Sequence, residues 1–163
     1  MADETKGASN NQRLLAAAKE DNLELIQEVF EAGDFDINFQ DGLGNTALHY
    51  AASLGCPEVL EEILSYDGCD VDPINRIEKA TPLHLALRLE DPEMRKYIVE
   101  SLLEAGADVK IKDKNGDTAL DVVPSSDTEL RAAIRKAQAS ASVSNDDFAD
   151  DDDDEPGSGS GSE

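Results

Sequence analysis

A four-residue motif recurs along this chain at a nearly constant spacing, and that spacing restricts the fold more than any other feature. TALH at 46–49 returns 35 residues later as TPLH at 81–84, and 37 residues after that as TALD at 118–121. A more divergent copy precedes them, because segment 14–21 shares its apolar and alanine positions with segment 48–55. Such a period predicts a stack of similar units, each of which buries its apolar face against its neighbours.

The units resemble the ankyrin repeat family. TPLH at 81–84, followed by LLEAGADV at 102–109, is close to the consensus of that family. The resemblance covers residues 12–138 and implies an all-α solenoid of about four helix-turn-helix units, joined by β-hairpin-like turns. An aromatic content of only 4% suits thin layers filled with Ala, Leu, Ile and Val. We expect the units at residues 12–43, 44–78, 79–115 and 116–138.

The two ends of the chain lack the apolar pattern of the repeats. Residues 1–11 are polar, and we expect a flexible leader that ends by capping a first helix over Gln12–Lys19. Residues 139–163 are rich in Ser, Gly and Asp, a composition that predicts a disordered acidic tail. Of the formal net charge of −23, residues 146–163 contribute −9, with nine acids and no bases, and residues 1–145 contribute −14.

Units three and four depart from the repeat pattern. Lys79 stands where units two and four have Gly44 and Gly116, so this turn needs either a non-glycine residue in a left-handed conformation or a different turn type. Unit three also has four extra residues, about one helical turn, and we expect its second helix to begin one turn early. In unit four, SDTE at 126–129 predicts a capping box for a last helix over Thr128–Gln138.

The residues of the repeated motif have structural roles in this interpretation. The hydroxyl groups of Thr46, Thr81 and Thr118 are placed to accept a hydrogen bond from a free backbone N–H in the first turn of a helix. The resemblance implies that the motif histidines, His49 and His84, bond to that threonine and to neighbouring backbone. These five residues are therefore expected to hold each helix to the turn before it.

The residues of this sequence do not predict catalysis, a cofactor or a metal site. Neither His49 nor His84 has a second ligand-type residue at helical spacing, and Cys56 and Cys69 follow no metal or disulfide pattern. The motifs of nucleophilic enzymes and of nucleotide-binding loops do not occur. We expect a non-enzymatic protein without cofactors, in which both cysteines are small packed residues with reduced thiols.

Partner contacts in ankyrin proteins come from the turns, which project as fingers, and from the exposed side of the first helix of each unit. The resemblance carries these contacts to positions in units two, three and four. They are Leu43, Asn45, Ser53, Leu54, Ile77, Glu78, Ala80, Arg88, Leu89, Lys114, Asn115 and Asp117.

Four of these positions are large and apolar: Leu43, Leu54, Ile77 and Leu89. On one groove they would form a contiguous patch of the kind that marks partner sites. The alternative is that Leu54 and Leu89 pack between neighbouring first helices. Exposure is favoured for Leu43 and Ile77, because turn tips have little core to join.

Net charge points to the kind of partner. A basic face is needed to bind nucleic acid through its phosphates, and an acidic chain is repelled by anionic membrane. We expect a monomer in the cytoplasm, the nucleus or both, with a basic protein as its partner. A dedicated chaperone for a ribosomal protein is the more specific hypothesis; the alternatives are a regulator that masks a basic localisation or DNA-binding segment, and an assembly scaffold.

The acidic tail has three possible roles: it captures basic surface, it keeps the chain soluble, or it folds back onto basic residues of the last unit. Ser144 and Ser160 are each followed by acidic residues and resemble acid-directed phosphorylation sites. Phosphorylation there would add about −1.5 to −2 charge at each serine.

Overall fold

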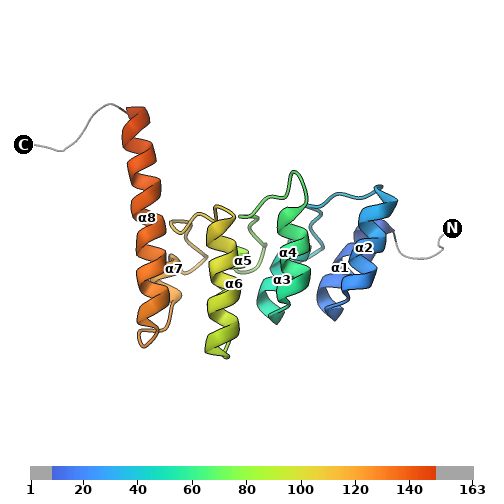
Figure 1. The fold of residues 1–163 in the computed structure, drawn as a ribbon, viewed down its shortest axis with the longest axis horizontal. Helices are drawn as coiled ribbons and strands as arrows, with labels where there is room; N and C mark the ends of the chain where they lie inside the picture. The colour runs from blue at the N-terminus through green and yellow to red at the C-terminus, as the bar shows by residue number, and fades with distance from the viewer. Residues whose placement is uncertain (1–8, 150–163) are drawn as a thin grey trace, which may run out of the picture.

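The computed structural model describes residues 9–149, which contain eight helices and no strands. The helices form four pairs that stack side by side in chain order, so that the first and last pairs lie at opposite ends of the molecule (Figure 1). This confirms the all-α solenoid. The helices are α1 (Asn10–Glu20), α2 (Leu23–Ala32), α3 (Ala47–Leu54), α4 (Pro57–Ser65), α5 (Pro82–Ala86), α6 (Pro92–Glu104), α7 (Ala119–Val122) and α8 (Thr128–Ala149).

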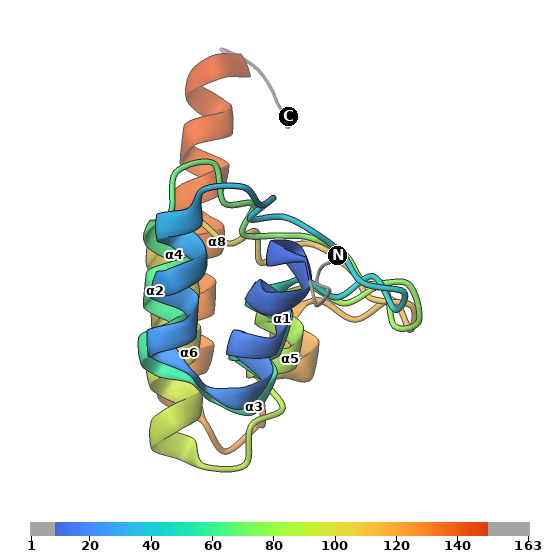
Figure 2. The same ribbon diagram turned by 90° about the vertical axis from the view of Figure 1, so that its right-hand side faces the viewer.

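The first and second helices of the pairs form two separate layers. α1, α3 and α5 follow one another in one layer, whereas α2, α4, α6 and α8 follow one another in the other (Figure 2). The turns that precede α3, α5 and α7 project together to one side, beyond the layer of first helices. We call the layer of α2, α4 and α6 the second-helix face.

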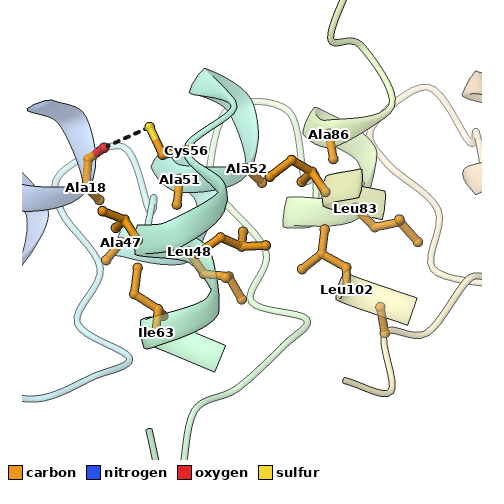
Figure 3. Close-up of a cluster of buried hydrophobic side chains, with 14 of the residues drawn as sticks. Ala18, Ala47, Leu48, Ala51, Ala52, Cys56, Ile63, Leu83, Ala86 and Leu102 are labelled. Atoms are coloured by element: carbon orange, nitrogen blue, oxygen red, sulfur yellow. Dashed lines mark hydrogen bonds between the residues drawn. The ribbon is translucent and has the colours of Figure 1, made fainter. Parts of the chain in front are cut away.

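The core lies between the two layers and runs from unit to unit. Leu48 and Leu83 are each 1% exposed, and Leu102 is fully buried below them. Ala51 and Ala52, both fully buried, let α3 come close to its neighbours α1 and α5 (Figure 3). Each buried leucine contributes about 1.5–3 kcal/mol relative to exposure, and that contribution depends on the neighbouring unit being folded.

The first helix begins two residues earlier than the sequence predicted. Its N-cap is Ser9, whose hydroxyl accepts a hydrogen bond from the N–H of Gln12 at 3.2 Å, while the Gln12 side chain accepts one from the N–H of Ser9 at 3.1 Å. Asn10 and Asn11 are therefore helical, not part of a leader. Residues 1–8 of the predicted leader lie outside the described residues.

The second helix of unit three begins one turn early, as predicted. α6 has 13 residues where α4 has 9, and Asp91 caps it by accepting from the N–H of Glu93 at 3.0 Å. The added turn carries Arg95, which is buried, and its guanidinium donates to Asp127 at 3.0 and 3.2 Å. The same guanidinium donates to the carbonyl of Leu89 at 2.7 Å. The extension thus joins unit three to the start of the last helix.

The last helix differs from the prediction at both of its ends. Asp127 caps α8 in place of Ser126, because its carboxylate accepts the N–H of Leu130 at 3.2 Å. The helix runs on to Ala149, past the predicted end at Gln138. Neither Gly nor Pro occurs from residue 128 to residue 149, and alanine is frequent, so no local signal stops the helix. The predicted disordered tail is therefore wrong for 139–149, and its residues 150–163 lie outside the described part.

Candidate partner-binding surface

The projecting turns of units two, three and four are built on one plan. We call them finger 2 (residues 41–45), finger 3 (75–80) and finger 4 (113–117). In fingers 2 and 4 the first and last residues are joined by backbone hydrogen bonds of 3.0 Å, Asp41 to Asn45 and Asp113 to Asp117. Finger 3 is one residue longer, because Asn75 bonds instead to Ala80 at 3.1 Å.

Finger 3 has a lysine, Lys79, at the position where the other two fingers have a glycine. This residue has φ of +55°, the left-handed conformation that Gly44 and Gly116 adopt in the other two fingers with φ of +82° and +81°. Of the two alternatives that the sequence left open, the strained non-glycine residue is therefore realised, together with one extra residue in the turn.

The carboxylates at the base of fingers 2 and 4 hold these turns closed. Asp41 accepts from the N–H groups of Leu43 and Asn45 at 2.9 and 3.0 Å and from the hydroxyl of Tyr50. Burial by itself would raise the pKa of Asp41, but the hydrogen bonds from Tyr50, Asn45 and Leu43 outweigh it and hold the pKa below its usual value. The pKa of Asp113, its counterpart in finger 4, is lowered in the same way, by hydrogen bonds from the N–H groups of residues 117 and 115.

The motif histidines connect each finger to the next unit. Nδ1 of His49 accepts from the N–H of Thr46 at 3.0 Å, so the ring proton lies on Nε2, which donates to the carbonyl of Ala80 at 2.9 Å. His84 repeats the arrangement with Thr81 at 3.2 Å and with the carbonyl of Asp117 at 2.9 Å. Burial lowers the pKa of His49 below 6.5 and keeps its ring neutral.

The last copy of the motif lacks this connection. The Asp121 carboxylate accepts from both the N–H and the hydroxyl of Thr118, at 2.9 and 3.1 Å, and so closes the first turn of α7. The hydroxyls of Thr46 and Thr81 accept from the N–H groups of His49 and His84 at 3.2 and 3.3 Å, as predicted. The hydroxyl of Thr118 instead donates to Asp121 and makes no such cap.

The three fingers are also bonded directly to one another. The N–H of Arg76 donates to the carbonyl of Leu43 at 2.9 Å, and the N–H of Lys114 donates to the carbonyl of Glu78 at 2.8 Å. A β-carbon at Gly44 would lie 2.7 Å from the nitrogen of Arg76. The fingers therefore form a continuous, hydrogen-bonded edge rather than three independent loops.

Two of the four predicted apolar residues come together on this edge. Leu43 is 49% exposed and Ile77 is 61% exposed, and a backbone hydrogen bond joins Leu43 to Arg76, the residue before Ile77. Leu54 is also exposed, at 54%, but it ends α3, about 12 Å along the helix from the finger. Leu89 is half-buried and packs against the core. The expected single patch of four is therefore reduced to Leu43 and Ile77.

Several predicted contact residues are occupied with holding the fingers in place. Asn45 accepts from the side chain of Asn75 at 3.0 Å, and Glu78 accepts from Arg88 at 2.9 Å. Other members of the predicted set differ in exposure: Ala80 is buried, Ser53 and Asp117 are half-buried, and Lys114 and Asn115 are exposed at the tip of finger 4.

Sequence reasoning missed three features: the polar group around Tyr50 and Asp41, the mostly buried pair of Arg95 with Asp127, and an exposed Tyr97. The first had a signal in the sequence, because Asp or Asn stands at the start of every finger. The second had none, because its partners are 32 residues apart.

The other titratable groups offer no reactive site within residues 9–149. Burial raises the pKa of the Cys56 and Cys69 thiols to about 11, with Asp21 and Asp70 adding to the effect, so both stay protonated at neutral pH. Neither cysteine is in a disulfide, and no three ligand-type side chains gather there into a metal site. None of the helices in this range has the length and apolarity needed to cross a membrane. Ser144 lies on α8, and Ser160 lies outside the described residues.

Paired helices stacked in line, with hydrogen-bonded fingers along one edge, define a repeat scaffold of the ankyrin type. A model of ankyrin repeats, in three copies, matches residues 14–113. The chain is 40% identical over 130 residues to an ankyrin repeat-containing protein of Saccharomyces cerevisiae, YGL242C, with 73% of this chain and 72% of that protein covered. The chain therefore belongs to the ankyrin repeat family, whose repeats are protein–protein interaction modules.

Two further relatives share the repeats within much longer proteins. The E3 ubiquitin-protein ligase hecd-1 of Caenorhabditis elegans is 30% identical over 111 residues, which are 68% of this chain and 4% of that protein. The ankyrin repeat and SOCS box protein 6 of Homo sapiens is 42% identical over 86 residues, which are 52% of this chain and 20% of that protein. The aligned segment is thus a small part of each of these two proteins.

Proposed function

We propose that this chain is a non-enzymatic adaptor that binds a protein partner through the finger edge. The observation that carries the proposal is the exposure of Leu43 and Ile77 side by side on a hydrogen-bonded edge. Apolar side chains held rigidly at the surface bind without a large loss of their own conformational entropy. A partner segment that covers both residues removes their apolar area from water.

We further propose that the partner carries a basic region, which contacts the second-helix face. The helices α2, α4 and α6 hold nine glutamates, eight of them exposed, and two bases. Both bases are engaged with the last helix, Arg95 with Asp127 and Lys96 with Glu129 at 3.2 Å. A basic segment is thus attracted to this face, most strongly at low salt.

A dedicated chaperone for a basic ribosomal protein is the most specific form of this proposal. It rests on the acidic charge and on the finger edge together. A regulator that masks a basic localisation or DNA-binding segment would use the same two surfaces, and an assembly scaffold would need only the finger edge. The net charge of −23 favours the first two.

The test is a comparative capture from cell lysate. The bait is the full chain, the double variant Leu43→Ser/Ile77→Ser, or a variant with Glu24→Gln, Glu58→Gln and Glu93→Gln on the second-helix face. A retained basic protein that is lost with the finger variant and elutes at lower salt from the glutamine variant would support the proposal. Retention that is the same for all three baits would overturn it. Melting temperatures close to that of the unmodified chain would show that the variants fold.

A further inference from the structure

Basic side chains surround the apolar pair on the finger edge, although the molecule as a whole is acidic. Arg76, Lys79 and Lys114 are all exposed, and they belong to fingers 3 and 4. We propose that the finger edge binds a segment in which Leu, Ile or Val is flanked by Asp or Glu, not the basic region of the partner. This inference rests on the proposed function, because it specifies the chemistry of the segment that the finger edge takes.

Two of the three bases are tied to the apolar pair by backbone contacts. The N–H of Arg76 donates to the carbonyl of Leu43, and Cγ of Arg76 lies 2.9 Å from the position of a β-carbon on Gly44. The stem of this side chain therefore runs along finger 2 beside Leu43. The N–H of Lys114 donates to the carbonyl of Glu78, the residue after Ile77. Arg76 thus lies at the contact between fingers 2 and 3, and Lys114 lies on the side of finger 4.

Three of the four finger carboxylates are engaged by hydrogen bonds or an ion pair. Asp41 and Asp113 accept from N–H groups of their own turns, and Asp113 is buried. Glu78 is paired with Arg88 at 2.9 Å. Asp117 is half-buried at the base of finger 4, where its N–H bonds to Asp113. The exposed charges at the tips are therefore mostly positive.

A groove between α1 and finger 2 is lined by Lys19, Glu20 and Asp41 together with Phe39 and Gly42. The Asp41 carboxylate in this groove already accepts hydrogen bonds from its own finger and from the Tyr50 hydroxyl. The tips themselves decide the local potential, because charges further away than about 8 Å are screened at physiological salt. The acidic second-helix face lies in the layer on the far side of the first helices from the fingers (Figure 2).

The chemistry of the site then sets its specificity. The apolar pair provides buried area, and a carboxylate of the ligand meets an exposed guanidinium or ammonium group at the rim. Such rim pairs add little affinity each, but they exclude a segment of the same sign of charge. A lysine-rich segment would bring its ammonium groups next to Arg76, Lys79 and Lys114 and is therefore disfavoured.

The probe for this proposal is a phage library of random dodecapeptides, selected on the immobilised full chain at about 150 mM salt. Selected peptides are then synthesised and titrated against three proteins. These are the unmodified chain, the finger variant Arg76→Gln/Lys79→Gln/Lys114→Gln, and a control with Arg131→Gln, Arg135→Gln and Lys136→Gln on α8. Glutamine keeps most of the length of each side chain and removes only its charge.

We expect acidic peptides that contain Leu, Ile or Val, with affinity at least about tenfold lower for the finger variant and unchanged for the control. Basic peptides whose binding is abolished by Leu43→Ser would overturn this inference and leave the proposed function standing. Peptides that bind the finger variant and the unmodified chain equally would also overturn it. A selection in which no peptide depends on Leu43 or Ile77 would overturn both.

Discussion

At the scale of single residues, the stability of this stack depends on a few buried polar side chains that span two units. His49 is the clearest, because its ring bonds to Thr46 in its own unit and to Ala80 in the next. The stabilisation from apolar burial is shared by many residues, whereas this hydrogen-bonded connection between two units depends on one side chain. Its loss leaves partners on both sides without a hydrogen bond.

His49→Ala is expected to destabilise the protein by about 2–4 kcal/mol, because the buried N–H of Thr46 and the buried carbonyl of Ala80 lose their partner. The control is Asp121→Ala, which removes the same motif position where it is exposed and should cost clearly less. Urea unfolding followed by circular dichroism measures both. Equal losses would mean that the contact with the next unit contributes nothing.

Asp72 should make part of the stability depend on pH. Burial, and then its neighbours Asp108 and Asp70, raise its pKa to about 6, although the N–H of Asp108 opposes this. The folded chain therefore binds this proton more tightly than the unfolded chain, whose pKa is near 3.8. Its contribution is fully present below that value and is lost as pH rises through about 6.

Asp72→Asn is accordingly expected to raise the melting temperature at pH 7.5 by a few degrees, roughly 1 kcal/mol, and to change it little at pH 4. The amide oxygen can still accept the N–H of Asp108. Thermal melts at both pH values decide the matter. An equal shift at the two pH values would show that the charge of Asp72 is not the cause.

At the scale of elements, the fingers and the last helix are fixed by contacts between units. Finger 2 approaches finger 3 so closely at Gly44 that a side chain does not fit, whereas finger 4 leaves Gly116 open. The extra turn of α6 holds the start of α8 through a pair whose side chains are only 10% and 15% exposed. Neither contact follows from the local conformation of the elements that it joins.

Gly44→Ala and Gly116→Ala separate backbone strain from crowding between fingers. Both glycines have φ near +80°, so either alanine should cost about 1–2 kcal/mol. Only at Gly44 does the new β-carbon meet Arg76, at 2.7 Å, and this should add at least about 1 kcal/mol by pushing the fingers apart. Chemical denaturation compares the two variants. An equal loss of unfolding free energy in both variants would indicate that finger 3 shifts without cost to make room for the new β-carbon.

Arg95→Ala should loosen the last helix. Removing this arginine leaves Asp127 without its ion pair in a mostly buried site, a change that costs about 3 kcal/mol. Lys96→Ala breaks the exposed pair with Glu129 and should cost much less, because water screens this pair. Amide hydrogen exchange in α8 is the measurement, and we expect it to rise sharply only in Arg95→Ala. Unchanged amide exchange in Arg95→Ala would show that the extra turn of α6 does not hold the last helix in place.

At the scale of the whole molecule, charge is distributed unevenly. The second-helix face holds most of the exposed glutamates, while the finger tips are basic. Like charges on adjacent helices of this face repel one another. Because the units stack in a row, the same repulsion recurs at each boundary between two units.

Added salt is therefore expected to stabilise the protein. Raising NaCl from about 20 to about 300 mM shortens the Debye length and should raise the melting temperature by a few degrees. In the Glu24→Gln/Glu58→Gln/Glu93→Gln variant the rise should be smaller, because less repulsion is left to screen. A melting temperature that falls with salt would mean that the ion pairs contribute more than the repulsion.

What the sequence determines by itself is the set of interactions within about four residues of each other. Three features could be predicted in this way: the TxLH motifs at helix starts, the threonine caps and the early start of α6. They follow from helical periodicity and from the hydrogen-bonding needs of helix ends. For Lys79 the sequence left two alternatives, a left-handed non-glycine residue or a different turn type, because a turn also depends on residues close together in the chain.

Tertiary structure decides everything that spans a unit boundary. It brings the fingers of Leu43 and Ile77 together, removes Leu54 and Leu89 from that surface and buries Arg95 against Asp127. It also engages most finger carboxylates in hydrogen bonds or an ion pair while Arg76, Lys79 and Lys114 stay exposed. These contacts join residues about 30 apart in the chain, and they depend on how the units are rotated and spaced in the stack. The repeat pattern predicts that units stack, but only the packed core sets which side chains meet.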